Sequence, residues 1–246
     1  MSDINSFIES LNVVIAENSV EVFLPSLQRT VKFKPINTKQ YKDICGSMKD
    51  NAIYNTRFII ATYNIIKDNC IEPEIVDQLN IIDRLFILLV LRKDILGPKL
   101  KDINIESCIA LASKIELPIS ETLNIGNVKI TTQIPSIKEV YEMELELRGD
   151  LQLKTMSIED LTQDFIINSC CKFIQNVQAG TVDLNFALFS FKDRLKIIEN
   201  LPAATLNRLQ DFAGKVTSLQ DSITNGPNNN NIYTQFYINT DFFLTE

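Results

Sequence analysis

Two short alternating stretches near the start of the chain, joined by a turn and followed by a helical pattern, constrain the fold most. Apolar and polar residues alternate over residues 20–24 and again over residues 31–33, as in strands with one buried face. Pro25–Gln28 can turn the chain, and Pro35 ends the pattern. Because an isolated two-stranded hairpin is only marginally stable, it must pack against other elements. We expect helices to support it, the first capped by Thr38.

Helical patterns account for much of the remaining chain. Phe7, Ile8 and Leu11 can line one face of a short helix near the N-terminus. Ser136, with Glu139 three residues later, has the spacing of a capping box. Spacing and breaks at Gly or Pro predict helices over approximately these ranges: 39–49, 55–68, 79–96, 136–148 with Gly149 as C-cap, 157–177, 191–201 with Ser190 as N-cap, and 202–219.

The most hydrophobic segment is Leu79–Leu96, which contains seven consecutive apolar residues, Leu85–Leu91. One interpretation is a membrane span, but a span needs about 20 apolar residues. Charged residues lie close to both ends of the run: Asp83, Arg84, Arg92, Lys93 and Asp94. We therefore interpret the segment as a helix buried on nearly all sides and expect no membrane span.

Residues 101–134 differ in character, since Ile, Leu and Val alternate loosely with polar residues between turn signals at Pro118 and Gly126. This pattern predicts a small β-rich insert, although residues 105–115 can instead form a short helix. Alternation over residues 232–238 predicts a C-terminal strand. The fold class that follows is α+β, mainly α-helical, with an N-terminal β-hairpin, a small β-rich insert and a C-terminal strand.

The same patterns suggest three regions in the 246-residue chain, which is long enough to bury a substantial core. Residues 1–100 hold the hairpin and the first helices, and residues 101–134 hold the insert. Residues 135–246 form a helical region with the C-terminal strand and an aromatic tail. The three regions can also form one composite domain.

The charge distribution and the lack of histidine argue against sites for nucleic acids, metals and cofactors and against a catalytic triad. Of the formal net charge of −7, residues 1–100 contribute nothing, whereas residues 101–246 hold 12 basic and 19 acidic residues. An acidic surface disfavours a phosphate backbone, so we expect no nucleic-acid partner. We interpret the densest basic group as the solvated side of the hairpin and its following helix: Lys32, Lys34, Lys39 and Lys42. With no histidine and no CxxC pair among five cysteines, we expect no catalytic triad, metal or cofactor.

Paired carboxylates are the remaining enzymatic option. Glu142 and Glu146 would share one helix face, and a hydrolase could use two such carboxyls if burial separated their pKa values. The simpler interpretation is a solvated acidic helix face. We therefore expect no catalytic residues and no enzymatic activity.

Five aromatic residues gather near the end of the chain, beyond an asparagine-rich loop: Tyr233, Phe236, Tyr237, Phe242 and Phe243. Aromatic side chains are costly to leave in water. They can form a docking segment for a neighbouring subunit, or the tail can fold back onto its own core. We take these five as candidate partner-contact residues.

Four blocks of sequence resemble one protein family. They are VFLPSLQRTVKFKPINTKQYKDI, DRLFILLVLR, FKDRLKIIENLPAATLNRLQDFAGKV and the closing DFFL. These blocks are similar to segments of the baseplate hub subunits and hub assembly factors of T4-type contractile-tailed bacteriophages. The resemblance extends over nearly the whole chain and is weakest at residues 101–134.

The resemblance implies a non-enzymatic structural component of the phage tail baseplate hub that acts through contacts with other baseplate and hub proteins. Such a protein would be assembled in the host cytoplasm and reside in the virion tail baseplate. The alternative is a hub assembly chaperone that is absent from the mature virion. Relatives with cysteine pairs in the middle and near the end could hold a metal, but this chain has only Cys108 in the middle and no cysteine after Cys171. The resemblance therefore implies no metal site here.

Overall fold

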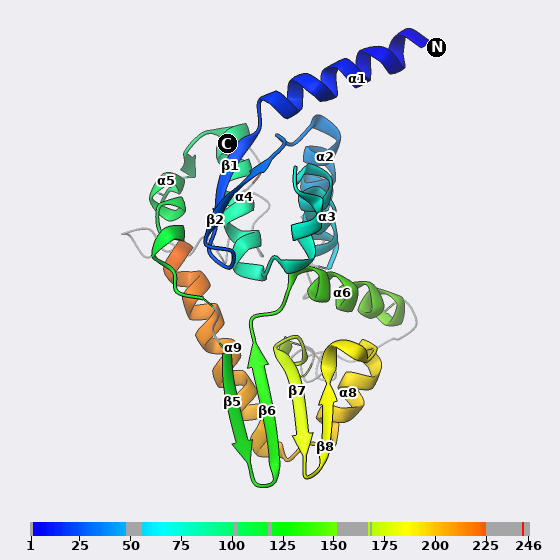
Figure 1. The fold of residues 1–246 in the computed structure, drawn as a ribbon, viewed down its shortest axis with the longest axis vertical. Helices are drawn as coiled ribbons and strands as arrows, with labels where there is room; N and C mark the ends of the chain where they lie inside the picture. The colour runs from blue at the N-terminus through cyan, green and yellow to red at the C-terminus, as the bar shows by residue number, and fades with distance from the viewer. Residues whose placement is uncertain are drawn as a thin grey trace. The chain divides into compact units, whose positions relative to one another are not determined.

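The computed structural model describes residues 2–47, 56–100, 103–117, 120–151, 167, 169–224 and 243. The fold class is α+β, as predicted (Figure 1). The chain divides into two compact units. Unit 1 consists of Met1–Ile115 together with Gln220–Glu246, and unit 2 is Glu116–Leu219. The predicted C-terminal strand, the asparagine-rich loop and most of the predicted helix at 157–177 lie outside the described residues.

Unit 1 combines the predicted hairpin with helices on either side of it in the sequence. The hairpin pairs β1 (Val20–Leu24) antiparallel with β2 (Arg29–Phe33) through the predicted turn. The helical elements are α1 (Ser2–Glu17), α2 (Thr38–Ser47), α3 (Thr56–Asn69), η1 (Pro73–Gln78), α4 (Ile81–Leu96), α5 (Ile105–Ile109) and η2 (Ala112–Lys114). A short antiparallel pair, β3 (Lys99–Leu100) and β4 (Ile103–Asn104), lies between α4 and α5.

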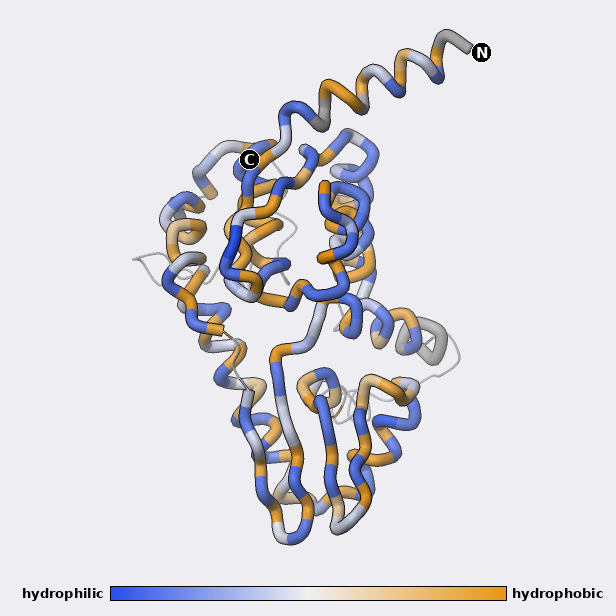
Figure 2. The backbone as a smooth tube through the Cα atoms, viewed as in Figure 1, coloured by the Kyte–Doolittle hydropathy of each residue, from blue (hydrophilic) through white to orange (hydrophobic). Residues whose placement is uncertain are grey.

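The core of unit 1 forms where the apolar face of the hairpin meets α4. Leu24 and Phe33 are fully buried, and β1 packs against α4. Every residue of α4 from Ile81 to Arg92 is buried, which confirms the interpretation of the hydrophobic run as an enclosed helix. Figure 2 shows the hydrophobic residues of this helix in orange. No helix in the described part of the chain is long and apolar enough to span a membrane.

Polar side chains cap the unit 1 helices. Asn80 and Asp83 form a capping box at the start of α4, with Asn80 Oδ1 accepting from the Asp83 N–H at 3.1 Å. At α2, Asn37 Oδ1 accepts from the Gln40 N–H at 2.9 Å, and Gln40 Oε1 accepts from the Asn37 N–H at 3.1 Å. The prediction of Thr38 as the cap of this helix was wrong because Thr38 is already its first residue.

Unit 2 is built on a four-stranded antiparallel sheet of order β5-β6-β7-β8. The strands are β5 (Ser120–Ile125), β6 (Val128–Gln133), β7 (Ile174–Ala179) and β8 (Val182–Asn185). The first hairpin lies in the predicted β-rich region, and it pairs with strands from much later in the chain. The predicted helix end near Val177 was wrong, because Val177 pairs with Ile130 and Leu184 in the middle of the sheet.

Helices α8 (Phe191–Glu199) and α9 (Ala203–Thr224) pack on one face of this sheet, and η3 (Phe186–Leu188) lies between β8 and α8 in the sequence. Helix α6 (Ile137–Leu151) lies at the end of the sheet (Figure 1). The buried core joins Ile130 and Val177 from the strands to Met143, Phe191 and Leu209 from the helices. Buried and more exposed positions alternate along much of β6, so one face of the sheet carries the core. The tube in Figure 2 shows hydrophobic and hydrophilic residues following one another along the strands.

The capping predictions in unit 2 are mixed. Ser136 and Glu139 form the predicted capping box of α6, since Ser136 Oγ accepts from the Glu139 N–H at 3.1 Å and Glu139 Oε2 accepts from the Ser136 N–H at 2.9 Å. Ser190 caps α8 as predicted, accepting from the Asp193 N–H at 3.2 Å. Gly149 was wrongly predicted as the C-cap of α6, because that helix continues to Leu151. The last helix also runs further than expected, to Thr224.

Candidate functional site

The candidate partner-contact group at the C-terminus is described at one residue, Phe243. Its side chain is fully buried in unit 1. Its carbonyl accepts a hydrogen bond from the Tyr41 hydroxyl and a longer one, 3.8 Å, from Cys45 Sγ. Both partners lie on α2, so the chain end at Phe243 is held on that helix. The other four candidate residues lie outside the described part of the chain: Tyr233, Phe236, Tyr237 and Phe242.

Burial around this contact changes the acidity of the tyrosine. Loss of solvent raises the pKa of the Tyr41 hydroxyl, and the neighbouring Cys45 thiol raises it further. The positive charge of Arg92 acts in the opposite direction. Tyr41 therefore stays protonated at neutral pH and donates its hydrogen to the Phe243 carbonyl.

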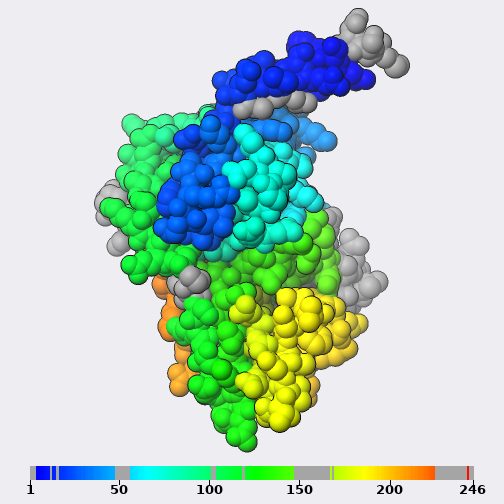
Figure 3. All heavy atoms as spheres, in the orientation of Figure 1, coloured from blue at the N-terminus to red at the C-terminus, as the bar shows by residue number. Residues whose placement is uncertain are grey.

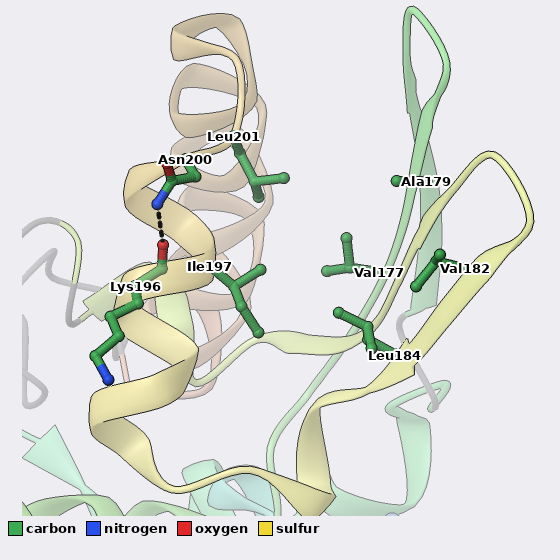
Figure 4. Close-up of a pocket in the computed structure, with 8 residues that line it drawn as sticks. All are labelled: Val177, Ala179, Val182, Leu184, Lys196, Ile197, Asn200 and Leu201. Carbon is green, nitrogen blue, oxygen red and sulfur yellow. Dashed lines mark hydrogen bonds between the residues drawn. The ribbon is translucent and has the colours of Figure 1, made fainter.

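An apolar groove lies in unit 2 (Figure 4). Its volume is about 320 Å³. Strands β7 and β8 supply one wall, and α8 with the residues that follow it supplies the other. Its lining residues are Val177, Ala179, Val182, Leu184, Lys196, Ile197, Asn200 and Leu201. We call this surface the β7–β8/α8 groove.

The register of the sheet explains why the groove is apolar. Leu184 lies opposite Val177, and Val182 lies opposite Ala179, so all four share the face that carries the unit 2 core. Val177 is buried, whereas Val182 is 54% exposed. The groove is therefore a partly exposed part of the core face near the β7–β8 turn.

The groove offers shape and apolar contact and lacks a reactive pair. In Figure 4 the side chains of Ile197 and Leu201 point toward the strands, while Lys196 and Asn200 point away from the gap. Asn200 Nδ2 donates to the Lys196 carbonyl at 2.7 Å, and Lys196 Nζ lies 2.9 Å from Asp193 Oδ1. No acidic residue lines the groove, so it has no carboxylate for acid–base chemistry.

The two carboxylates of the hydrolase hypothesis lie on α6 and are both exposed. Glu146 Oε2 accepts a hydrogen bond from the Phe191 N–H at 2.8 Å. This N–H is at the first residue of α8 and has no partner within that helix, so Glu146 satisfies it. The pair therefore lies on a solvated face as the simpler interpretation expected, and Glu146 has a structural contact there.

The cysteines have the properties of packing residues. All five are free, and four of them are buried: Cys70, Cys108, Cys170 and Cys171. Burial raises the pKa of Cys170 to about 11 and that of Cys171 to about 12, so neither is a thiolate at neutral pH. Within the described residues, no three His, Cys, Asp or Glu side chains gather closely enough to hold a metal ion.

None of the groove residues was predicted from the sequence to line a binding surface. The reason is that Val177 was assigned to a helix, and the groove requires the β7–β8 pairing. The alternation of residues 177–179 and 182–184 on either side of the turn at Gly180, whose φ is 60°, is the signal that could have indicated a hairpin.

Comparison with known proteins identifies one family. The model of the family described as T4 bacteriophage base plate protein matches residues 15–238. No significant match occurs among curated proteins or among solved structures. The matched range covers most of the chain and includes the hairpin, the enclosed helix α4 and the four-stranded sheet.

Proposed function

We propose, since the chain belongs to the T4 bacteriophage base plate protein family, that it is a structural component of the hub at the centre of a contractile tail's base plate. Its partners are other base plate and hub proteins of the same phage, and it resides in the virion after assembly in the host cytoplasm. The observation that carries this proposal is the family match over residues 15–238. Membership supports the base plate, and the resemblance of four sequence blocks to hub proteins supports the hub.

The character of the described surfaces supports a role without catalysis. The β7–β8/α8 groove is lined by apolar side chains and has no acidic residue. The exposed carboxylate Glu146 is engaged at the start of α8. Apolar surface left open on a folded protein is typical of a site of protein–protein contact.

We also propose that the aromatic tail contributes to these contacts. Phe243 is buried and held by Tyr41 on α2, which anchors the chain end on unit 1. The remaining four aromatic residues are the proposed contacts with a neighbouring subunit: Tyr233, Phe236, Tyr237 and Phe242. Tyrosine and phenylalanine are enriched at such contacts because they bury a large area with few rotatable bonds.

Quantitative mass spectrometry of purified phage particles tests the proposed function. A structural hub component is expected in every preparation at a fixed ratio to the other base plate proteins. Detection in infected cells together with absence from purified particles would contradict a structural role and would favour the assembly chaperone. A ratio that varies between preparations would indicate contamination and would also count against residence in the virion.

A further inference from the structure

Helix α1 (Ser2–Glu17) carries exposed apolar side chains along most of its length. Ile4 and Phe7 are each 67% exposed, and every other α1 side chain that the structure describes is exposed as well. Figure 3 shows the atoms of α1 in blue, uncovered on the face in view. Hydrophobic and polar segments alternate along the helix in Figure 2, as expected for an amphipathic helix.

Five exposed apolar residues of α1 form one stripe. At about 100° of rotation per residue, they fall within an arc of about 120° on the helix surface. The stripe consists of Ile4, Phe7, Ile8, Leu11 and Val14. Val13 is also apolar and is 59% exposed, but it lies about 100° around the helix from Val14 and outside the arc. We call the five residues the α1 stripe.

The stripe belongs to a well-formed helix. Asn18 closes the C-terminal end, since its Nδ2 and its backbone N–H both donate to the Val14 carbonyl, at 2.9 and 3.3 Å. Ser10 Oγ donates to the Ser6 carbonyl at 3.0 Å on the polar side. A single helix of this length is marginal in water unless its apolar face packs against something. The α1 stripe is therefore a surface that gains stability from a partner.

The charges of α1 indicate what kind of partner fits. Residues 2–17 contain Asp3, Glu9 and Glu17 and no Lys or Arg, so the helix carries only negative charge. Helices that bind anionic membrane surfaces carry Lys and Arg on the polar face. Asp3 and Glu17 lie about 20° and about 60° beyond the Val14 edge of the stripe, so two copies of α1 packed stripe to stripe would bring like charges to the same contact, which disfavours self-association. Charge complementarity favours a groove with Lys or Arg at its rim.

We propose that α1 docks by the α1 stripe into an apolar, basic-rimmed groove on another base plate protein. This inference rests on the proposed function for the source of the partner. Family membership does not account for it, because the matched range begins at residue 15 and most of α1 precedes it. In this mode of binding, an amphipathic helix places its apolar face in a groove of the partner. The side chains at positions i, i+3, i+4 and i+7 that would enter the groove are Ile4, Phe7, Ile8 and Leu11.

Two adjacent valines provide the test. The full chain is titrated by calorimetry against each purified base plate protein of the same phage, as wild type, Val14→Asp and Val13→Asp. Both variants make the same chemical change in the same helix, at exposed positions. Val14→Asp places a charge in the stripe and is expected to weaken binding at least about tenfold, whereas Val13→Asp is expected to change it less than about threefold.

A third variant tests the basic rim. Glu17→Lys reverses an exposed charge about 60° beyond the Val14 edge of the stripe, so it is expected to weaken binding at low salt and to reduce the dependence of affinity on salt concentration. Equal affinity of wild type and Glu17→Lys at low salt would overturn the basic-rimmed groove. Circular dichroism of all variants checks that the helix content is unchanged.

The outcomes separate the docking helix from the proposed function. Binding of a base plate protein that is equally strong for Val14→Asp and Val13→Asp would overturn the docking helix and leave the base plate role intact. Failure of every base plate protein to bind the wild-type chain would overturn both. Loss of self-association in Val14→Asp, seen by sedimentation, or binding of wild type to phosphatidylglycerol vesicles would replace the proposed partner and overturn the proposal.

Discussion

At the level of single residues, Asp83 joins two parts of unit 1 that are far apart in sequence. Its carboxylate accepts from the Asn80 N–H at 2.9 Å in the α4 capping box and from the Ser26 N–H at 3.0 Å in the hairpin turn. The Ser26 hydroxyl donates to it as well. Burial raises the pKa of this carboxyl, and the hydrogen bonds from Asn80 and Ser26 oppose that rise. These three hydrogen bonds allow a carboxyl group to lie in the core.

Replacing this group should therefore be costly. We expect Asp83→Ala to lower the free energy of unfolding by about 3 kcal/mol, because it leaves partly buried donors of Ser26 and Asn80 without their acceptor. Urea denaturation measures the loss. Asp94→Ala, an exposed position on the same helix, is the matched control and should change stability by less than about 0.5 kcal/mol. Equal losses for the two variants would contradict the role of Asp83.

The buried thiol Cys171 predicts a dependence of stability on alkaline pH. Burial raises its pKa from 9.0 to about 12, with Arg194 acting in the opposite direction. Above pH of about 9, the thiol of the unfolded chain loses its proton, whereas the buried thiol of the folded chain keeps it. The free energy of unfolding therefore falls as pH rises from about 9 to about 12. The contribution is at most about 1.4 kcal/mol per pH unit.

Cys171→Ala removes this contribution. We expect the variant to lose less stability than the wild type between pH of about 8 and about 10, measured by urea denaturation at each pH. The comparison uses the slopes, because the substitution also lowers stability at every pH by removing a buried side chain. Parallel slopes for the two proteins would show that Cys171 ionises similarly in the folded and unfolded chains.

At the level of elements, α2 shows which of two neighbouring residues caps a helix. Asn37 and Thr38 both have side chains that cap helices well. Asn37 also has Gln40 three residues later, and the two exchange side-chain and backbone hydrogen bonds. The Asn-x-x-Gln pattern thus places the start of α2 one residue earlier than Thr38 alone predicted.

A pair of neighbouring substitutions tests this cap. We expect Asn37→Ala to lower the free energy of unfolding by about 1 kcal/mol, since the Gln40 N–H loses its acceptor. Thr38→Ala should have little effect or stabilise slightly, because Thr38 is already helical and alanine has the higher helix propensity. Thermal or urea unfolding of both variants measures the difference. A larger loss for Thr38→Ala would contradict the assignment.

The aromatic tail gives an element-scale prediction that separates anchoring from docking. Phe243→Ala removes a fully buried ring and should lower the free energy of unfolding by about 3–5 kcal/mol. Phe236→Ala is expected to weaken association with a base plate partner while stability stays nearly unchanged. Calorimetric binding and urea unfolding of both variants measure the two effects. A stability loss for Phe236→Ala with unchanged affinity would favour a tail folded onto its own core.

At the level of the whole molecule, each of the two units has its own hydrophobic core. Unit 1 buries the hairpin against α4, with Phe33 and Phe86 fully enclosed. Unit 2 buries one face of its sheet against α8 and α9, with Met143 of α6 in the same core and Phe186 and Phe212 fully enclosed. The Phe212 ring also meets Phe173 edge to face at 5.7 Å.

Because the two cores are separate, we expect a destabilising substitution in one unit to lower local stability mainly in that unit. We expect Phe86→Ala to increase amide hydrogen exchange chiefly in unit 1 and Phe212→Ala to increase it chiefly in unit 2. Each substitution should cost about 3–5 kcal/mol, since each removes a fully buried ring. Hydrogen exchange followed by mass spectrometry measures protection along the chain. Equal deprotection of both units by either variant would indicate one cooperative core.

The amino-acid sequence by itself determined the features that depend on neighbours within a few residues. The β1–β2 hairpin, the enclosed helix α4, the capping box at Ser136 and the cap at Ser190 follow from local alternation, turns and caps, and the structure has each of them. The α+β class and the base plate family follow from these same stretches. Such features need no distant partner, because their hydrogen bonds and apolar faces are set by residues close in the chain.

Only the tertiary structure decided the features that join distant segments. Val177 became part of a strand because Ile130 and Leu184 offered backbone partners that no local pattern reveals. Asp83 reads as a surface charge beside an apolar run, yet it is buried because the hairpin turn supplies its donors. The β7–β8/α8 groove exists only because β7 pairs with β8 and both strands face α8. In each case the free energy comes from contacts between residues far apart in sequence, which a local pattern cannot contain.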